Sequence, residues 1–305
     1  RKAVDSATAI IPHPTIQVWP MRQKLTFVVI GMLMTLPNVA HSAVLGGISS
    51  SSFLTADLEV SLLGGGAAVD GDLTVGPSVA GTAPTAYSFD QEVLNVSASA
   101  GINPLITAIG VGSSSVDVLA SSTVDGGLGS RNATGNQLIE DFDLSIGELP
   151  VLADVLSITA DAITVSSVVD GDFGALSPVG TMNVTNFRVF VNGAQVGALL
   201  NGDITADFDF GLSTFLGGAT LTLNEQNIVG DGISSSSLET NAINLQLINV
   251  GVPAVGAIDG NVLVGLTGAS LQASAVPEPS SLAILSAASL GGVFWRRRRV
   301  VSPAC

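Results

Sequence analysis

Short runs of alternating apolar and polar residues, separated by turn-forming dipeptides, are the feature that most constrains the fold of this chain. The runs are rich in Val, Ile, Leu and Thr and repeat with a period close to two. Because successive side chains of a strand point to opposite faces, this period predicts strands with one buried face. The clearest runs are residues 73–75, 116–118, 143–146, 158–165, 184–191, 219–223 and 243–248.

Asp-Gly and Asn-Gly pairs stand between these runs. Such pairs favour the positive φ of tight hairpin turns. Many short strands joined in this way predict an all-β fold, either an antiparallel β-sandwich or an elongated β-sheet domain. We expect the Gly-rich and Ser-rich stretches to be loops or strand ends, and residues 110–115 to be a flexible connection. The pairs begin at Asp70, Asp125, Asp170, Asn192, Asn201, Asp231 and Asp259, and the Gly-rich and Ser-rich stretches are residues 46–52, 64–66 and 234–237.

The first 43 residues predict a processed leader. Residues 1–20 contain three prolines and no amphipathic period, and we expect them to precede the native start. Residues 21–43 predict a signal peptide, with a basic beginning, a helical apolar segment at 25–36, and small residues that suit signal peptidase. Cleavage is expected after Ser42 or Ala43, which leaves a body of residues 44–275.

The C-terminal segment has three parts. Residues 276–279 are Val276, Pro277, Glu278 and Pro279, and the two prolines fix φ and remove backbone donors, so this stretch is expected to be extended. Residues 280–295 predict a short transmembrane helix of roughly 24 Å, against roughly 30 Å for a bilayer hydrocarbon core. Residues 296–305 form a tail that resists translocation across the membrane because it contains Arg296, Arg297, Arg298 and Arg299.

These three parts, in this order, resemble the PEP-CTERM sorting signal of exported bacterial proteins. The resemblance implies processing by an exosortase, a membrane-embedded transpeptidase-like enzyme, near the Pro-Glu-Pro tripeptide. Signal peptidase, exosortase and the membrane are then the expected partners, and the cell surface or extracellular matrix is the expected destination. An ordinary C-terminal anchor would need the same apolar run and positive tail, but it would not explain the two prolines.

The charge of the body excludes several classes of function. Residues 44–275 contain twenty-three Asp and Glu against only Arg131 and Arg188, a net charge of −21. Nucleic acid is excluded as a partner, because phosphate neutralisation requires clustered basic residues. The body contains no Cys, His, Lys or Trp, so nucleophilic triads and zinc sites built on His or Cys are excluded. We expect no enzymatic activity and no cofactor; Cys305, behind the arginines, is expected to be an incidental thiol.

Carboxylates are the remaining catalytic candidates. The stretches 140–143 and 207–209 each place two Asp on one face of a predicted strand, and a glycosidase needs two carboxyls roughly 5 to 10 Å apart. The favoured alternative is a solvated strand face opposite buried Phe142 and Phe208. Sugar sites usually also offer aromatic platforms, and Tyr87 and scattered phenylalanines are the whole supply in the body.

Asp-Gly-Asp elements offer a weak calcium hypothesis. Asp70 with Asp72, Asp170 with Asp172, and Asn201 with Asp203 provide carboxylates or an amide beside a turn. None of them completes an EF-hand loop or a nonapeptide repeat, so simple turns are the favoured interpretation.

The body also resembles the choice-of-anchor surface proteins, type P, through residues 115–119, 158–163, 187–193, 221–226 and 230–232. That resemblance implies an exported β-rich body and no assigned activity. Glu225 is the candidate for a family-specific role, with a polar strand-end residue as the alternative. Two functional hypotheses remain: a structural or adhesive surface protein within exopolysaccharide, or a carbohydrate-binding or carbohydrate-cleaving module. The second requires a concave pocket with two facing carboxyls and an exposed aromatic side chain.

Overall fold

The computed structural model describes residues 41–62, 69–103, 106–148, 154–252 and 256–276. Residues 21–40 of the predicted leader, the Pro-Glu-Pro tripeptide, the predicted transmembrane helix and the arginine tail lie outside this part of the chain. In the part that is described, no helix has the length and apolar character needed to cross a bilayer.

Twelve strands and one short 3-10 helix make up the described body, so the all-β prediction is confirmed. They are β1 (His41–Leu62), β2 (Val69–Thr82), β3 (Tyr87–Asn103), β4 (Ile106–Ser122), β5 (Arg131–Glu148), β6 (Leu156–Asp172), β7 (Ala175–Val191), β8 (Ala194–Ile204), β9 (Phe208–Asp209), η1 (Leu212–Thr214), β10 (Ala219–Gly230), β11 (Ser235–Val252) and β12 (Gly256–Val276).

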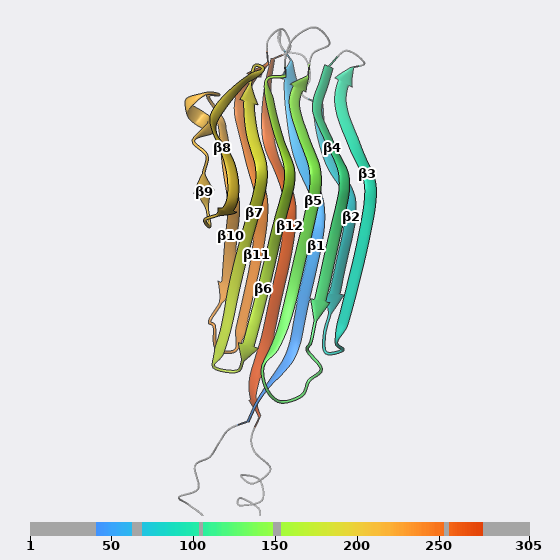
Figure 1. Cartoon of the computed structure of the whole chain (residues 1–305), viewed down its shortest axis with the longest axis vertical. Coiled ribbons are helices and arrows are strands. Elements are labelled where there is room, and N and C mark those ends of the chain that lie inside the picture. Colours follow the sequence, from blue (N-terminus) through green and yellow to red (C-terminus); the bar gives the residue numbers. More distant parts are fainter. Residues whose placement is uncertain (1–40, 63–68, 104–105, 149–153, 253–255, 277–305) are drawn as a thin grey trace, which may run out of the picture. The chain divides into compact units, whose positions relative to one another are not determined.

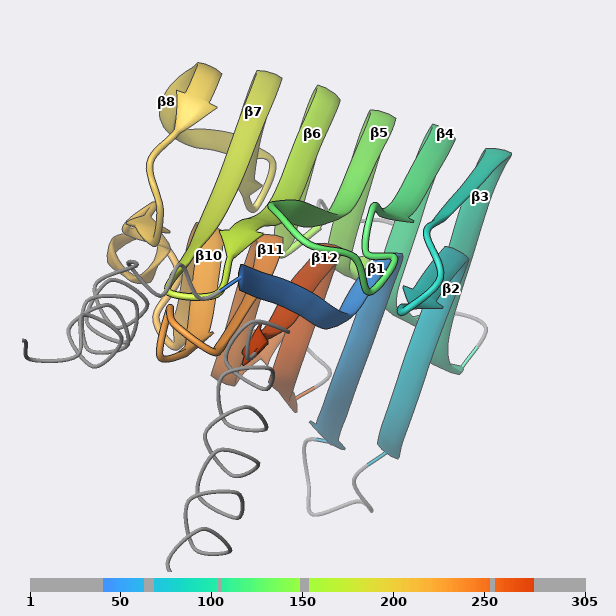
Figure 2. The same cartoon turned by 90° about the horizontal axis from the view of Figure 1, so that it is seen from below.

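The strands form two six-stranded sheets in which every neighbouring pair is antiparallel. One sheet has the order β2-β1-β12-β11-β10-β9 and the other the order β3-β4-β5-β6-β7-β8. Figures 1 and 2 show the sheets as two stacked layers, a β-sandwich. The first and last strands, β1 and β12, are neighbours in the middle of their sheet, so the body begins and ends at the same end.

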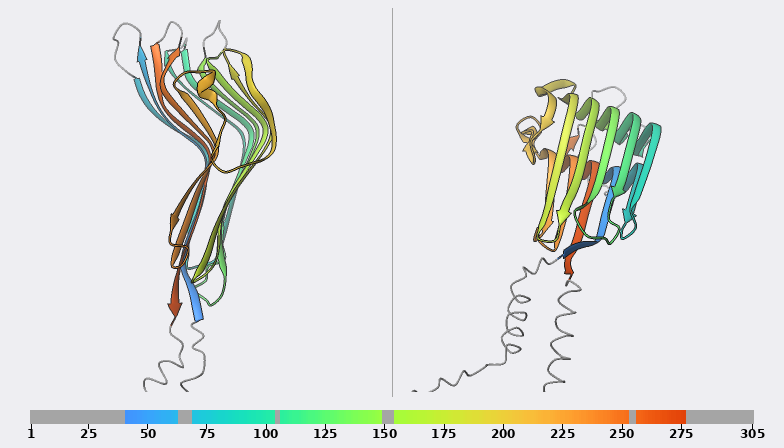
Figure 3. Two further views of the ribbon diagram at one scale, coloured as in Figure 1. Left: turned by 90° about the vertical axis from the view of Figure 1, so that its left-hand side faces the viewer. Right: turned by 60° about the horizontal axis from the view of Figure 1, so that its bottom comes forward.

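A row of residues with positive φ crosses each sheet, and we call each row a waist. In the β3–β8 sheet the row contains Asn95, Asp141 and Asn186, on alternate strands, with φ of 55°, 49° and 53°. In the other sheet it contains Gly76, Gly265 and Asn224, with φ of 85°, 68° and 52°. Left-handed residues inside a strand produce bulges that bend it, and Asn, Asp and Gly adopt this conformation most readily. In profile the strands change direction midway along their length (Figure 3, left).

Each waist also shifts the alternation of buried and exposed side chains by one position. In β5 the buried residues are odd-numbered from Ala133 to Ile139 and even-numbered from Phe142 to Ile146, with Glu140 and Asp141 both exposed between them. In β1, Phe53 and Leu54 are consecutive buried residues. A single long strand therefore reads in the sequence as two short runs with different phase.

The interior differs on the two sides of the waists. The larger part, which we call the apolar zone, is a continuous cluster of aliphatic and aromatic side chains that includes fully buried Phe53, Phe142 and Phe187. Toward the end of the body that holds His41 and Val276, small polar residues lie among the apolar ones, which include a second apolar cluster with Val124, Val169 and Leu271. This hydroxyl zone consists of buried Ser49, Ser51, Ser122, Gln137, Ser167, Ser236, Thr240 and Thr267, together with Gly135 and Gly180.

The two sheets approach each other closely in the hydroxyl zone. A Cβ on Gly135 would overlap the backbone carbonyl of Ser50 in the opposite sheet, and one on Gly180 would lie 2.6 Å from Cδ of Gln226. Hydrogen bonds cross the gap: the Ser167 hydroxyl lies 2.8 Å from Thr240 Oγ1 and 3.0 Å from the Thr267 carbonyl oxygen. Figure 3 (left) shows the layers close together in this half and splayed apart in the other.

Several local predictions were wrong for a common reason. Residues 46–52 and 110–115 lie inside β1 and β4, because Gly and Ser fit the narrow interior and its bulges, whereas residues 235–237 form the beginning of β11, as predicted for a strand end. The pairs at Asp70, Asp170, Asn201 and Asp259 also lie within strands, where positive φ serves bulges as well as turns: φ is 128° at Gly171, 94° at Gly202 and 138° at Gly260. The pairs at Asp125, Asn192 and Asp231 do lie in connections between strands.

Candidate functional site

The end of the body that holds His41 and Val276 is the best-defined candidate site. The ladder between β1 and β12 continues to the pair His41 and Val276, with Ser42 opposite Ala275. Pro277 follows directly. Because proline has no backbone N–H, it is a poor continuation of a central strand, and β12 ends one residue before it. The body thus passes into the Pro-Glu-Pro tripeptide without an intervening linker.

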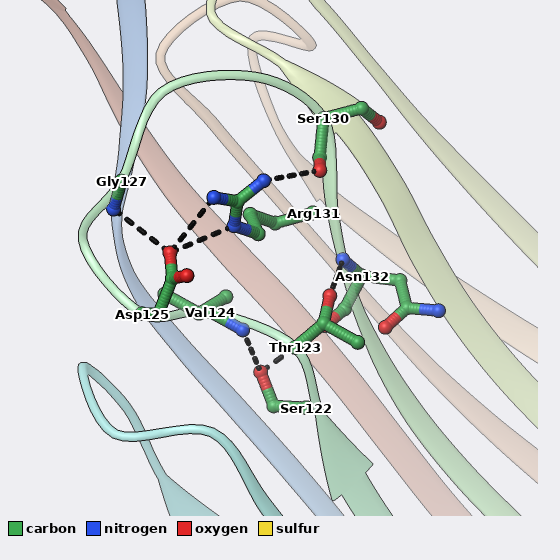
Figure 4. Close-up of polar contacts among 8 residues, drawn as sticks. All are labelled: Ser122, Thr123, Val124, Asp125, Gly127, Ser130, Arg131 and Asn132. Carbon is green, nitrogen blue, oxygen red and sulfur yellow. Dashed lines mark hydrogen bonds and ion pairs between the residues drawn. The ribbon is translucent and has the colours of Figure 1, made fainter.

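The loop between β4 and β5 lies against the same end (Figure 4). Asp125 Oδ1 accepts hydrogen bonds from Gly127 N (2.8 Å) and Arg131 Nε (2.9 Å), and it forms an ion pair with Arg131 Nη2 at 2.9 Å. The hydrogen bond from the Arg131 guanidinium is the main reason why the pKa of Asp125 lies below its usual value. Leu128, at the tip of this loop, forms a β-bridge with Ala43. One of the two basic residues of the body therefore holds a loop against the start of β1.

A second polar turn closes this end between β10 and β11. Asp231 Oδ1 accepts hydrogen bonds from the backbone N–H groups of Ile233, Ser234 and Ser235 at 2.7 to 2.9 Å, and Oδ2 accepts one from the Ser234 hydroxyl. These donors hold the pKa of Asp231 far below its usual value. Gly174, in the hairpin between β6 and β7, donates to the Ile233 carbonyl, so hairpins from the two sheets are joined here.

The paired carboxylates lie on exposed parts of the body. Asp141 and Asp143 are both exposed, on either side of buried Phe142, as expected for a solvated strand face, and Asp141 has positive φ. Asp207 accepts a hydrogen bond from the backbone N–H of Gln226, and Asp209 accepts one from that of Gly211, each with its Oδ1 atom. These two aspartates stabilise local backbone turns.

The calcium candidates are spread over several elements. Asp72 lies on β2 opposite Asp57 of β1, while Asp172 accepts the N–H of Phe173 and Asp203 accepts Asn183 Nδ2, both at 2.8 Å. Asp70 and Asp170 lie in β2 and β6. Among the described residues, no group of three or more His, Cys, Asp or Glu is arranged to hold a metal ion.

Glu225 lies at the waist of its sheet, in the middle of β10 rather than at a strand end. Its Oε2 accepts hydrogen bonds from Asn241 Nδ2 at 2.8 Å and Asn244 Nδ2 at 2.9 Å, both on neighbouring β11. The irregular pairing at Ala242 brings these two amides to the same side of the sheet. Glu225 therefore stabilises the bend in its sheet, which accounts for it without a ligand.

Sequence reasoning missed an acidic group on the outer face of the β3–β8 sheet. Glu92 of β3 lies directly opposite Asp117 of β4. Burial raises the pKa of Asp117, and the nearby carboxylates of Asp90 and Glu92 raise it further. Two neighbouring strands that each carry acidic residues are a signal for such a group. The sequence alone does not reveal it, because the strand register decides which residues lie opposite each other.

Two shallow grooves lie on the body. One, of roughly 380 Å³, runs over β12 between β1 and β11 and is lined mainly by Ser, Gly and aliphatic side chains with Glu239 as its carboxylate. The other, of roughly 520 Å³, lies between the edge strands β2 and β3 and is lined by residues 78–80 and 88–91. Phe89 in this second groove is 48% exposed and stacks on Tyr87, with ring centroids 5.4 Å apart.

Comparison with known proteins assigns the C-terminal segment. Residues 275–299 match the family model described as the PEP-CTERM protein-sorting motif. This segment marks a precursor that is exported, membrane-anchored and sorted through an exosortase. No curated protein and no solved structure matches the chain. The resemblance of the body to the choice-of-anchor proteins stays a prediction.

Proposed function

We propose that this chain is a non-enzymatic protein of the bacterial cell surface or extracellular matrix, with a structural or adhesive role within exopolysaccharide. Its acidic β-sandwich is exported by way of the signal peptide, and the apolar segment 280–295 holds the precursor in the membrane until an exosortase acts near Pro277–Pro279. The finer assignment to the choice-of-anchor type P proteins belongs to the same proposal.

The observation that carries this proposal is the direct passage from β12 into the matched sorting motif at residue 275. A body with a net charge of −21 repels its own copies and stays hydrated. Candidate catalytic aspartates such as Asp207 and Asp209 already accept backbone hydrogen bonds, which supports a role without catalysis. Twelve mostly long strands with few loops provide a durable scaffold of the kind that a matrix protein requires.

Mass spectrometry of both ends of the protein, purified from its native cells, tests the proposal. We expect an N-terminus at Ala43 or Val44 and loss of the C-terminal segment that contains Arg296–Arg299. Labelling of surface carboxylates on intact cells should modify the body. An intact Cys305 end in cells that contain an exosortase, or a body protected from the label, would contradict the proposal.

Glycan binding is a second candidate function, favoured by the groove between β2 and β3. The groove places an exposed aromatic ring, Phe89, beside the polar side chains of Ser88, Asp90 and Gln91. Aromatic faces contact the apolar side of sugar rings while carboxylate and amide groups bind hydroxyls. Phe89→Ala should weaken retention on the exopolysaccharide of the native cells about tenfold. Leu94→Ala is the control, because Leu94 is 63% exposed on the same strand but outside the groove; equal retention by both variants and the wild type would exclude this groove.

A further inference from the structure

The end of β12 has only one strand partner. Its last two residues, Ala275 and Val276, pair with Ser42 and His41 of β1. On the other side, the pairing with β11 stops at Ser235 opposite Gln272.

The two ends that pair here are the two ends that processing enzymes are expected to cut. The matched sorting motif begins at residue 275, so its first two residues lie inside the β1–β12 ladder. Their partners, His41 and Ser42, belong to the predicted leader and leave with it when signal peptidase cleaves after Ser42. Cleavage after Ala43 would in addition remove the partner of Ser274.

We propose that the leader end of β1 masks the beginning of the sorting motif and that leader removal exposes it. This inference rests on the proposed function, because it concerns regulation of the same processing site. Enzymes that act on a peptide backbone bind it as an extended strand, with its N–H and C=O groups available. While Ala275 and Val276 are paired with β1, the ladder holds both residues in place, and the N–H and C=O groups of one of them are engaged with β1. After leader removal the free segment begins at residue 275.

The structure also limits how far the new end can fray. Ala43 is 2% exposed and is held from both sides, by Ser274 of β12 and by Leu128 of the β4–β5 loop. The ion pair between Asp125 and Arg131 fixes that loop. Cleavage after Ser42 therefore frees the motif without loosening the rest of the strand.

Two full-length variants separate masking from other effects of a retained leader. Ala40→Leu replaces the small residue three positions before the cut, blocks signal peptidase and keeps both masking pairs. The triple variant Ala40→Leu/His41→Pro/Ser42→Pro also retains the leader, but its prolines cannot donate the backbone hydrogen bonds of the ladder. Both are expressed in cells with an active exosortase, with leader retention checked by N-terminal mass and export checked by external labelling.

Pulse-chase analysis of the C-terminal mass gives the outcome. We expect Ala40→Leu to lose its tail at least about tenfold more slowly than the wild type. The pairs between β1 and the end of β12 must open before the exosortase can bind the segment. The triple variant should recover to within about threefold of the wild-type rate. Processing of Ala40→Leu at the wild-type rate, or failure of the triple variant to recover, overturns the masking proposal. A wild-type chain that never loses its tail instead overturns the proposed function.

Discussion

The apolar zone and the hydroxyl zone are two solutions to packing the same pair of sheets. In the apolar zone, side chains such as Phe142, Phe187 and Ile158 fill a wide gap and are fully buried. In the hydroxyl zone, Gly and Ser let the backbones approach, and directional contacts such as Ser167 to Thr240 replace bulk. The difference indicates that the apolar zone derives its stability mainly from burial of apolar area, whereas in the hydroxyl zone steric fit and hydrogen bonds such as that of Ser167 add to apolar burial around Val169 and Leu271.

Truncation in the apolar zone should have the largest effect. Phe187→Ala removes a ring that is 0% exposed and in edge contact with Phe210, so we expect a loss of about 3–5 kcal/mol in the free energy of unfolding. Urea denaturation measures it. Phe89→Ala, at a ring that is 48% exposed, should change stability by less than about 0.5 kcal/mol. Equal losses of stability in the two variants would contradict the larger contribution that we assign to the buried ring.

Addition of a single methyl group in the hydroxyl zone should have the next largest effect. Gly135→Ala forces a Cβ into the backbone of the opposite sheet, and we expect a cost of about 1–3 kcal/mol. Gly112→Ala is the matched control on the neighbouring strand, because a Cβ there meets nothing within 4 Å. That variant should be neutral or slightly more stable. If Gly135→Ala were equally neutral in thermal unfolding, the sheets would not be in close contact at this level.

Loss of one hydroxyl should cost less than the added methyl group. Ser167→Ala leaves the buried hydroxyls of Thr240 and Thr267 without their partner from the opposite sheet, at a cost of about 1–2 kcal/mol. A double-mutant cycle with Thr240→Val should give a coupling energy of at least about 0.5 kcal/mol. Additive effects would show that the hydrogen bond between the sheets does not contribute to stability.

The waist should tolerate glycine and resist branched residues. Asp141 has φ of 49°, so Asp141→Val is expected to cost about 1–2 kcal/mol, because a β-branched side chain is strained in the left-handed region. Asp141→Gly should fold with nearly wild-type stability. Comparable stability of the two variants in urea would mean that the bulge can relax to regular pairing.

The aspartates with lowered and with raised pKa values should respond to acid with opposite signs. Asp125 and Asp231, beside the hydroxyl zone, have lowered pKa values, so their stabilisation is present above the unfolded pKa of about 3.9 and is lost as the pH falls toward the folded values. Burial raises the pKa values of Asp143 and Asp154, at the other end, so their contribution is greatest at low pH and is lost as the pH rises through the raised values. Melting temperature should therefore be highest in mild acid, above the unfolded pKa of about 3.9 and below the raised values.

Hydrogen exchange below about pH 3 should locate this effect. The turn at Asp231 and the β4–β5 loop should lose protection before the strands of the apolar zone. Asp125→Asn removes one of the titrating groups and should flatten the acid limb of the melting curve. Uniform loss of protection along the body would contradict the assignment.

The sequence was sufficient for the class of fold but not for the length of its strands. Alternation in residues 143–146 and 184–191 correctly predicted parts of β5 and β7. It could not join residues 133–139 to residues 142–146, because the phase change at Glu140 and Asp141 resembles the end of a strand. Ser and Gly in residues 46–52 resembled a loop because their burial depends on the opposite sheet, and that is a tertiary property.

The candidate site was predicted only in part for the same reason. The sorting motif depends on local composition and could be recognised directly. The pairing of His41 and Ser42 with Val276 and Ala275 connects residues more than two hundred positions apart, and no local pattern contains it. The role of Arg131 in holding the β4–β5 loop likewise requires the folded geometry.

The central position of β12 determines how the body would carry mechanical load. Tension on an anchored tail pulls along the axis of β12, perpendicular to the hydrogen bonds that join it to β1 and β11. Those bonds then resist sliding together along most of the strand, and they do not open one after another. Such a strand is an anchoring point suited to a protein that is under tension from flow or from neighbouring molecules.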